Sequence, residues 1–189
     1  MRLDLDPWTY FNFVSQYATG LSVLVEPIYF LGSPEFVKIA LTYGKPILYK
    51  DFVISKEQID EASRLGVSSV LLIKRLLGDA LWDLVDYAVG LGLEPLIEVD
   101  NEEDALDVVG TNPNVMLGVN SRDLGDLSVS LDRAVSIIRA VRGRVDVIIA
   151  ESGVRNSSDA LRLAREGANA VLVGTALMRD MNLPGNYQA

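Results

Sequence analysis

The sequence predicts an α/β fold of the TIM (βα)8-barrel type, contained in one domain over residues 1–189. Three observations lead to this prediction: seven short apolar runs recur along the chain, helix-like segments lie between them, and a polar residue or a glycine stands at the end of most runs. Runs of Val, Ile and Leu with little polar alternation are typical of parallel strands covered on both faces. In chain order they are LSVLVE from residue 21, PILYKDF from 46, SVLLI from 69, EPLIEVD from 94, VMLGVN from 115, VDVIIAES from 145 and AVLVGT from 170.

The segments between these runs carry signals for the beginning and end of helices. Asp6 and Pro7 predict the start of an amphipathic helix in DPWTYFNFVSQYATG. Ser55 with Gln58 three residues later fits a capping box, and Gly66 fits a helix end.

The same punctuation recurs further along the chain. Asp79 precedes the helix-like segment DALWDLVDYAVGLG. Asn156 or Ser157 begins SSDALRLAREG, and Gly167 ends it. The pattern is therefore a strand followed by a helix, repeated seven times.

The polar residues at the strand ends favour a barrel over an open doubly wound sheet. In a barrel the carboxyl ends of all strands meet at one mouth, whereas an open sheet spreads them along a line. No G-x-G-x-x-G motif follows any of the runs, which argues against a dinucleotide fold. The residues at or near the strand ends are Glu26, Lys50, Glu98, Asn120, Glu151 and Gly174.

Only seven strands are evident, and we expect the first strand of the barrel to be missing from this chain. A seven-strand arc leaves two unpaired edges, and such edges favour association. We therefore expect self-association through the open barrel edges. A partner chain, a local distortion and a truncated chain all remain open as explanations.

Composition excludes several classes of function. With 17 Lys and Arg against 26 Asp and Glu, the net charge is −9, which disfavours a nucleic-acid partner. The chain has no Cys and no His, so disulfides, thiolate nucleophiles, the usual zinc sites and imidazole catalysis are excluded. We expect neither a metal nor a cofactor, and proton chemistry is left to Lys, Glu, Asp or Tyr.

A cytoplasmic protein without a membrane segment is the expectation for localisation. No apolar run approaches the roughly 20 residues that span a bilayer. The N-terminal residues MRLDLDPW also lack the apolar core of a signal peptide.

Lys50 and Glu98 are the first candidates for chemistry. Lys50 shares one strand face with Leu48, and Glu98 shares one with Leu96, so both side chains are predicted to point into the barrel near its mouth. Loss of solvation lowers the pKa of a lysine, while a carboxylate partner raises it, and the sequence does not decide between them. A structural ion pair at the rim is the alternative.

The last two strands predict a site for an anion. Glu151 is followed by Ser152 and Gly153, where a backbone N–H can approach an anion closely. Gly174 and Thr175 lead into a short helix, and loops after strands seven and eight form the usual phosphate site of this barrel. Taken singly, each glycine is better explained by a simple turn.

The segment VNSRDL adds polar candidates after another strand. Asn120 can donate to a substrate, and Arg122 can offer a bidentate fork. Pairing of Arg122 with Asp123 on the rim is the alternative. Phe30 serves either as a pocket wall or as packing.

These segments resemble the indole-3-glycerol phosphate synthase family of the tryptophan pathway. The resemblance runs from about residue 4 to residue 180, with the segments in the order and spacing of the family. The matching segments are EPIYFLGS, PILYKDFVISKEQIDEA, VLLI, EPLIEVDNEEDAL, LGVNSRDL, AESGV and VGTALMR.

The resemblance implies a carboxy-lyase that closes carboxyphenylamino-deoxyribulose phosphate to indole-3-glycerol phosphate, with loss of carbon dioxide and water. It implies that Lys50 is the general acid that protonates the substrate carbonyl, and that Glu98 transfers a proton during dehydration. The further implied groups are catalytic Asn120 and Glu151; substrate-binding Phe30, Phe52, Leu71, Arg122 and Ser152; and phosphate-binding Gly153, Gly174 and Thr175.

The chain departs from the family pattern at its beginning. In relatives the first strand supplies a catalytic glutamate and lysine, followed by a serine at the phosphate, and none of these has a counterpart here. The activity of this chain alone therefore stays open. The alternatives are a catalytically impaired relative that binds a small sugar phosphate, and another phosphate-binding barrel enzyme of histidine or tryptophan synthesis.

Overall fold

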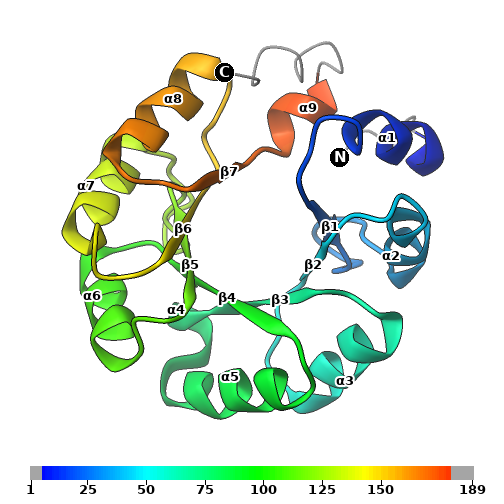
Figure 1. Ribbon diagram of the computed structural model, residues 1–189, viewed down its shortest axis with the longest axis horizontal. Coiled ribbons are helices and arrows are strands. Elements are labelled where there is room, and N and C mark those ends of the chain that lie inside the picture. Colours follow the sequence, from blue (N-terminus) through cyan, green and yellow to red (C-terminus); the bar gives the residue numbers. More distant parts are fainter. Residues whose placement is uncertain (1–5, 180–189) are drawn as a thin grey trace. The chain divides into compact units, whose positions relative to one another are not determined.

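The computed structural model describes residues 6–179 as alternating strands and helices (Figure 1). They divide into two compact units, of which the first ends at Pro95 and the second begins at Leu96. The single domain expected from the sequence remains a prediction. No helix within residues 6–179 is long and apolar enough to cross a membrane.

The first unit contains three parallel strands in chain order. Leu24 at the end of β1 lies opposite Lys50 at the end of β2. Helices α1, α2, α3 and α5 follow one another as neighbours around these strands (Figure 1). The strands are β1 (Leu21–Leu24), β2 (Ile47–Lys50) and β3 (Ser69–Ile73), and β4 (Glu94–Val99) begins at the end of this unit. The helices are α1 (Pro7–Val14), α2 (Pro34–Leu41), α3 (Lys56–Leu65), α4 (Lys74–Leu77), the 3-10 turn η1 (Gly78–Ala80) and α5 (Leu81–Gly90).

The alternation along β2 determines where Lys50 points. Ile47 and Tyr49 are buried, and the Tyr49 hydroxyl donates to Glu61 of α3 at 3.1 Å. Burial, followed by the charges of Glu61 and Asp51, raises the pKa of Tyr49, so this hydroxyl stays protonated as a donor. Because successive side chains alternate between faces, Lys50 lies with Leu48 on the face opposite α3, as predicted.

The second unit contains the rest of β4 and three further parallel strands. Glu98 lies opposite Gly118, and Asn120 lies opposite Glu151. Helices α6, α7 and α8 pack side by side along these strands (Figure 1). The strands are β5 (Met116–Asn120), β6 (Val147–Glu151) and β7 (Ala170–Leu172), and the helices are α6 (Glu102–Thr111), α7 (Leu131–Val141), α8 (Ser157–Glu166) and α9 (Thr175–Arg179).

Several helix boundaries follow the predicted caps. The Asp6 carboxylate accepts from the backbone N–H of Thr9 at 2.8 Å, at the beginning of α1. Asn156 caps α8 by accepting from the N–H of Asp159 at 3.0 Å. Gly66 ends α3 in the left-handed region with φ 82°, which a side chain would disfavour.

One predicted capping box and one predicted helix start were wrong. Ser55 precedes α3 as its N-cap, as predicted, but its hydroxyl makes no capping bond, and the side-chain oxygen of Gln58 accepts from the N–H of Ile54 instead of that of Ser55. Asp79 does not begin the long helix, because the chain turns into α4 directly after β3. Gly78, with φ 52°, ends α4 and leaves Asp79 inside η1, so that α5 begins at Leu81.

Candidate functional site

In the first unit, the loop after β1 is organised by the buried side chain of Glu26. Its carboxylate accepts from the backbone N–H groups of Ile28 at 2.8 Å, Tyr29 at 2.6 Å and Phe30 at 2.9 Å. Burial raises the pKa of Glu26, but these three N–H donors outweigh it, and the pKa lies below its usual value. The loop is thus fixed by an ionised carboxylate.

Close backbone packing also constrains this loop. Gly32 donates its N–H to the carbonyl of Glu26 at 2.7 Å. A Cβ atom on Gly32 would lie 2.5 Å from the carbonyl oxygen of Leu24, so no side chain fits there. Leu31, just before it, has φ 53°, a strained value for a residue with a side chain.

The fixed loop presents aromatic side chains beside the end of β2. The rings of Phe30 and Phe52 lie 5.9 Å apart, and that of Tyr29 lies 6.4 Å from Phe52. Phe30 and Phe52 remain 43% and 39% exposed, as a wall that receives a ligand must. The structure therefore brings two predicted wall residues together, whereas Leu71 is buried within β3 at 2% exposure.

In the second unit, Glu98 and Asn120 form the centre of a polar cluster at the strand ends. The Asn120 Nδ2 atom donates to Glu98 Oε1 at 2.9 Å, and both side chains are buried. The side-chain oxygen Oδ1 of Asn120 in turn accepts from the backbone N–H of Arg122 at 2.9 Å. With both ends of its amide engaged, Asn120 holds one orientation of the Glu98 carboxylate. Glu151 is likewise 2% exposed.

Ser121 connects this cluster to the turn after β6. Its hydroxyl donates to the carbonyl of Ser152 at 2.8 Å, and its N–H donates to the carbonyl of Glu151 at 2.9 Å. Ser152 and Gly153 both lie in the left-handed region, with φ 64° and 73°. A non-glycine residue in this region is strained, and such strain is concentrated at functional sites.

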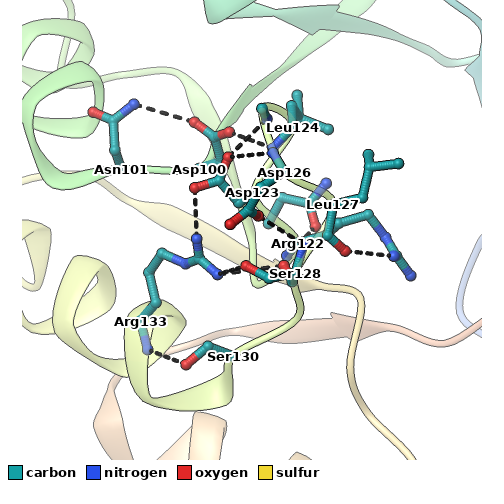
Figure 2. Close-up of polar contacts among 12 residues, drawn as sticks. Asp100, Asn101, Arg122, Asp123, Leu124, Asp126, Leu127, Ser128, Ser130 and Arg133 are labelled. Carbon is teal, nitrogen blue, oxygen red and sulfur yellow. Dashed lines mark hydrogen bonds and ion pairs between the residues drawn. The ribbon is translucent and has the colours of Figure 1, made fainter.

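The loop after β5 is held from β4 and from α7 (Figure 2). Asp100, directly after β4, is 1% exposed and accepts from the N–H of Leu124 at 2.8 Å, which fixes the middle of the loop. Asp123 accepts from Arg133 of α7 at 2.7 Å. Arg122 donates to the carbonyl of Leu127 at 3.1 Å.

An ion pair between Arg122 and Asp123 was the alternative to a substrate-binding role for Arg122. The structure assigns Asp123 a partner, Arg133, that the sequence analysis did not consider. Asp123 also accepts from the N–H of Gly125 at 2.7 Å, so the loop folds around this carboxylate. Asp123 therefore stabilises the loop that carries Arg122.

The predicted phosphate-binding residues lie at two turns of the second unit. Gly174 precedes α9 and accepts from the N–H of Met178 at 3.0 Å, and Thr175 is the first residue of α9. A Cβ atom on Gly174 would meet nothing within 4 Å, whereas one on Gly153 would lie 2.7 Å from the Ser121 hydroxyl. The open backbone at Gly174 is compatible with an approaching anion, and phosphate binding remains a prediction.

Asp100 and Ser121 are supporting residues that the sequence analysis missed. Asp100 lies one residue after β4 and beside the α6 cap Asn101, where an acidic residue is unremarkable. Its partner Leu124 lies 24 residues further along the chain, so no local sequence pattern predicts the contact.

Comparison with known proteins identifies the family. The family model for indole-3-glycerol phosphate synthase matches residues 1–188. The chain belongs to the indole-3-glycerol phosphate synthase family. It is 46% identical over 181 residues to the indole-3-glycerol phosphate synthase of Pyrobaculum arsenaticum, covering 95% of this chain and 72% of that relative. The corresponding enzyme of Pyrococcus furiosus is 39% identical over 169 residues, covering 87% of this chain and 73% of the relative.

Solved structures confirm the fold class. The tryptophan synthase α-subunit from Pyrococcus furiosus aligns with a TM-score of 0.72 at 14% identity, covering 93% of this chain and 83% of the other. A mandelate oxidase structure aligns with a TM-score of 0.67 at 15% identity, covering 96% and 64%. The predicted α/β fold of the TIM-barrel type and the predicted family of carboxy-lyases in tryptophan biosynthesis are both confirmed.

Proposed function

We propose that this chain converts carboxyphenylamino-deoxyribulose phosphate to indole-3-glycerol phosphate, with release of carbon dioxide and water. The observation that carries the proposal is the buried Glu98 carboxylate held by Asn120 at a strand end, in a chain of the indole-3-glycerol phosphate synthase family. A carboxylate oriented in this way is suited to move a proton.

Lys50 supplies the acid in the first half of the reaction. As the aromatic carbon that bears the carboxylate attacks the substrate carbonyl, the Lys50 ammonium donates a proton to the carbonyl oxygen. Carbon dioxide then leaves and its bonding electrons restore the aromatic ring. The position of Lys50 supports this role, because it lies partly buried at the end of β2 on the face opposite α3.

Glu98 serves the second half, in which the new hydroxyl leaves as water and a proton is removed from the ring system. The bond from Asn120 holds the carboxylate in one orientation for this step. Arg122, Ser152 and Glu151 orient the substrate in this scheme. Phe30 and Phe52 receive the aryl group, and Gly153, Gly174 and Thr175 receive the phosphate.

Product formation by the purified chain tests the proposal. We expect the fluorescence of indole-3-glycerol phosphate to appear with the unchanged chain and to be lost with Lys50→Ala. Lys38→Ala is the matched control, since this lysine is exposed on α2 and pairs with Glu35. Absence of product from the unchanged chain, or equal rates with Lys50→Ala, would refute the proposal. A sugar phosphate that raises the melting temperature without any turnover would indicate a binding protein instead.

Two further expectations belong to this proposal. We place the reaction in the cytoplasm, where a biosynthetic enzyme finds its substrate. We also expect self-association through strand edges, and sedimentation at increasing concentration tests it; a monomer at every concentration would contradict it.

A further inference from the structure

Gly118 lies in the middle of β5, where the carboxylate of Glu151 occupies the space that a side chain would need. A Cβ atom on Gly118 would lie 2.5 Å from Glu151 Oε1, 3.4 Å from Leu96 Cδ1 and 3.5 Å from the Cα of Glu98. Two heavy atoms that are not bonded do not approach to 2.5 Å in this way. A side chain at position 118 and the present position of the Glu151 carboxylate therefore exclude each other.

Backbone conformation does not explain this glycine. Gly118 is absent from the glycines with positive φ, and it pairs regularly with Glu98 on β4 and Ile149 on β6. Glycine inside a regular strand weakens the strand and usually marks a close approach of another group. The approaching group here is the Glu151 carboxylate.

The register shows how this carboxylate reaches its position. Glu151 lies opposite Asn120, two residues beyond Gly118 on β5, so its side chain extends back along the strand towards the level of Glu98. Glu98 and Glu151 are both 2% exposed. Gly118 thus lies opposite one buried glutamate, Glu98, and against the carboxylate of another, Glu151.

We propose that Gly118 is a positioning residue, which leaves the space for the Glu151 carboxylate and thereby sets where that carboxylate meets the substrate. This inference rests on the proposed function. A methyl group at position 118 would push the Glu151 carboxylate away from the level of Glu98. A displacement of about 1 Å in a catalytic site can lower the rate by about 100-fold.

The test compares Gly118→Ala with a matched glycine in the same unit. We expect Gly118→Ala to lower kcat by about 100-fold with little change in KM, because the group is displaced and not removed. Gly110→Ala in α6 is the control, since a Cβ atom there meets nothing within 4 Å, and it should leave kcat unchanged. Wild-type kcat in Gly118→Ala would overturn the proposal.

A second variant separates positioning from general damage to the fold. Glu151→Asp shortens the side chain by one methylene group and withdraws the carboxylate from position 118. The decrease in melting temperature in the double variant should therefore be smaller than the sum of the decreases in the two single variants. Additive losses, or failure of both Gly118→Ala and the double variant to fold, would overturn the inference.

The melting cycle also distinguishes this inference from the proposed function. If the unchanged chain forms no product, the proposed function fails, and the melting temperatures still show whether residue 118 and the Glu151 side chain compete for space. Non-additive melting then supports the contact, and additive melting rejects it.

Discussion

Asn120 and Glu98 are joined by a hydrogen bond of 2.9 Å between the ends of β5 and β4, and both side chains are buried. The bond orients the Glu98 carboxylate, to which the proposed chemistry assigns proton transfer. The Asn120 side chain is also held at its oxygen, because the backbone N–H of Arg122 donates to Asn120 Oδ1.

Replacement of Glu98 by glutamine tests the role of the carboxylate. The amide has nearly the same shape, but it cannot accept and release a proton, so kcat should fall by about 10²–10⁴-fold. Glu94→Gln at the exposed beginning of the same strand is the control and should retain the rate of the unchanged chain. Steady-state assays of both variants decide, and similar kcat values would contradict the role given to Glu98.

Removal of the Asp100 side chain tests the support of the loop after β5. Asp100→Ala leaves the N–H of Leu124 without its acceptor, and the loss of a buried partner costs about 1–3 kcal/mol of stability. We expect faster amide exchange at Leu124 and its neighbours, measured by hydrogen exchange. Asp100→Asn keeps one acceptor oxygen, so its exchange rate at Leu124 should lie between those of the unchanged chain and of Asp100→Ala. Equal exchange at Leu124 in the Ala variant and the unchanged chain would show that Asp100 does not hold the loop.

The Glu26 carboxylate makes part of the stability depend on pH. Its pKa is lower in the folded chain than in the unfolded chain, because three backbone N–H groups outweigh the effect of burial. Its contribution is therefore complete above the unfolded pKa of about 4.3, and is lost as the pH falls through the folded value.

Glu26→Gln should abolish this part of the pH dependence. Denaturant unfolding between pH 3 and pH 7 measures the unfolding free energy of Glu26→Gln and of the unchanged chain. The difference in unfolding free energy between the two chains should be largest at neutral pH and shrink in acid. A difference that stays constant over this range would exclude the ionised carboxylate as its source.

The strands were the most predictable part of this fold. All seven runs contain a strand, as continuous Val, Ile and Leu segments predict. The side of β2 on which Lys50 lies followed from the alternation of side chains, without any tertiary information.

Contacts between distant segments were not predictable in the same way. Asp100 reaches Leu124, and Glu151 reaches the space above Gly118, and each contact depends on how two strands are placed in register. The segment MLGVN predicts a strand, but nothing in it indicates that a side chain from another strand needs the space at its glycine. The start of α5 was missed for a related reason, since the short helix α4 changes the path of the chain before it.

The proposed function requires that Lys50 and Glu98 act on one substrate molecule, and we propose that they do. A crystal structure with a substrate analogue that cannot react tests it most directly. We predict hydrogen bonds from the Lys50 ammonium to the oxygen that replaces the substrate carbonyl, and from the analogue to the Glu98 carboxylate. An analogue that binds while either residue lies outside contact distance would contradict the claim.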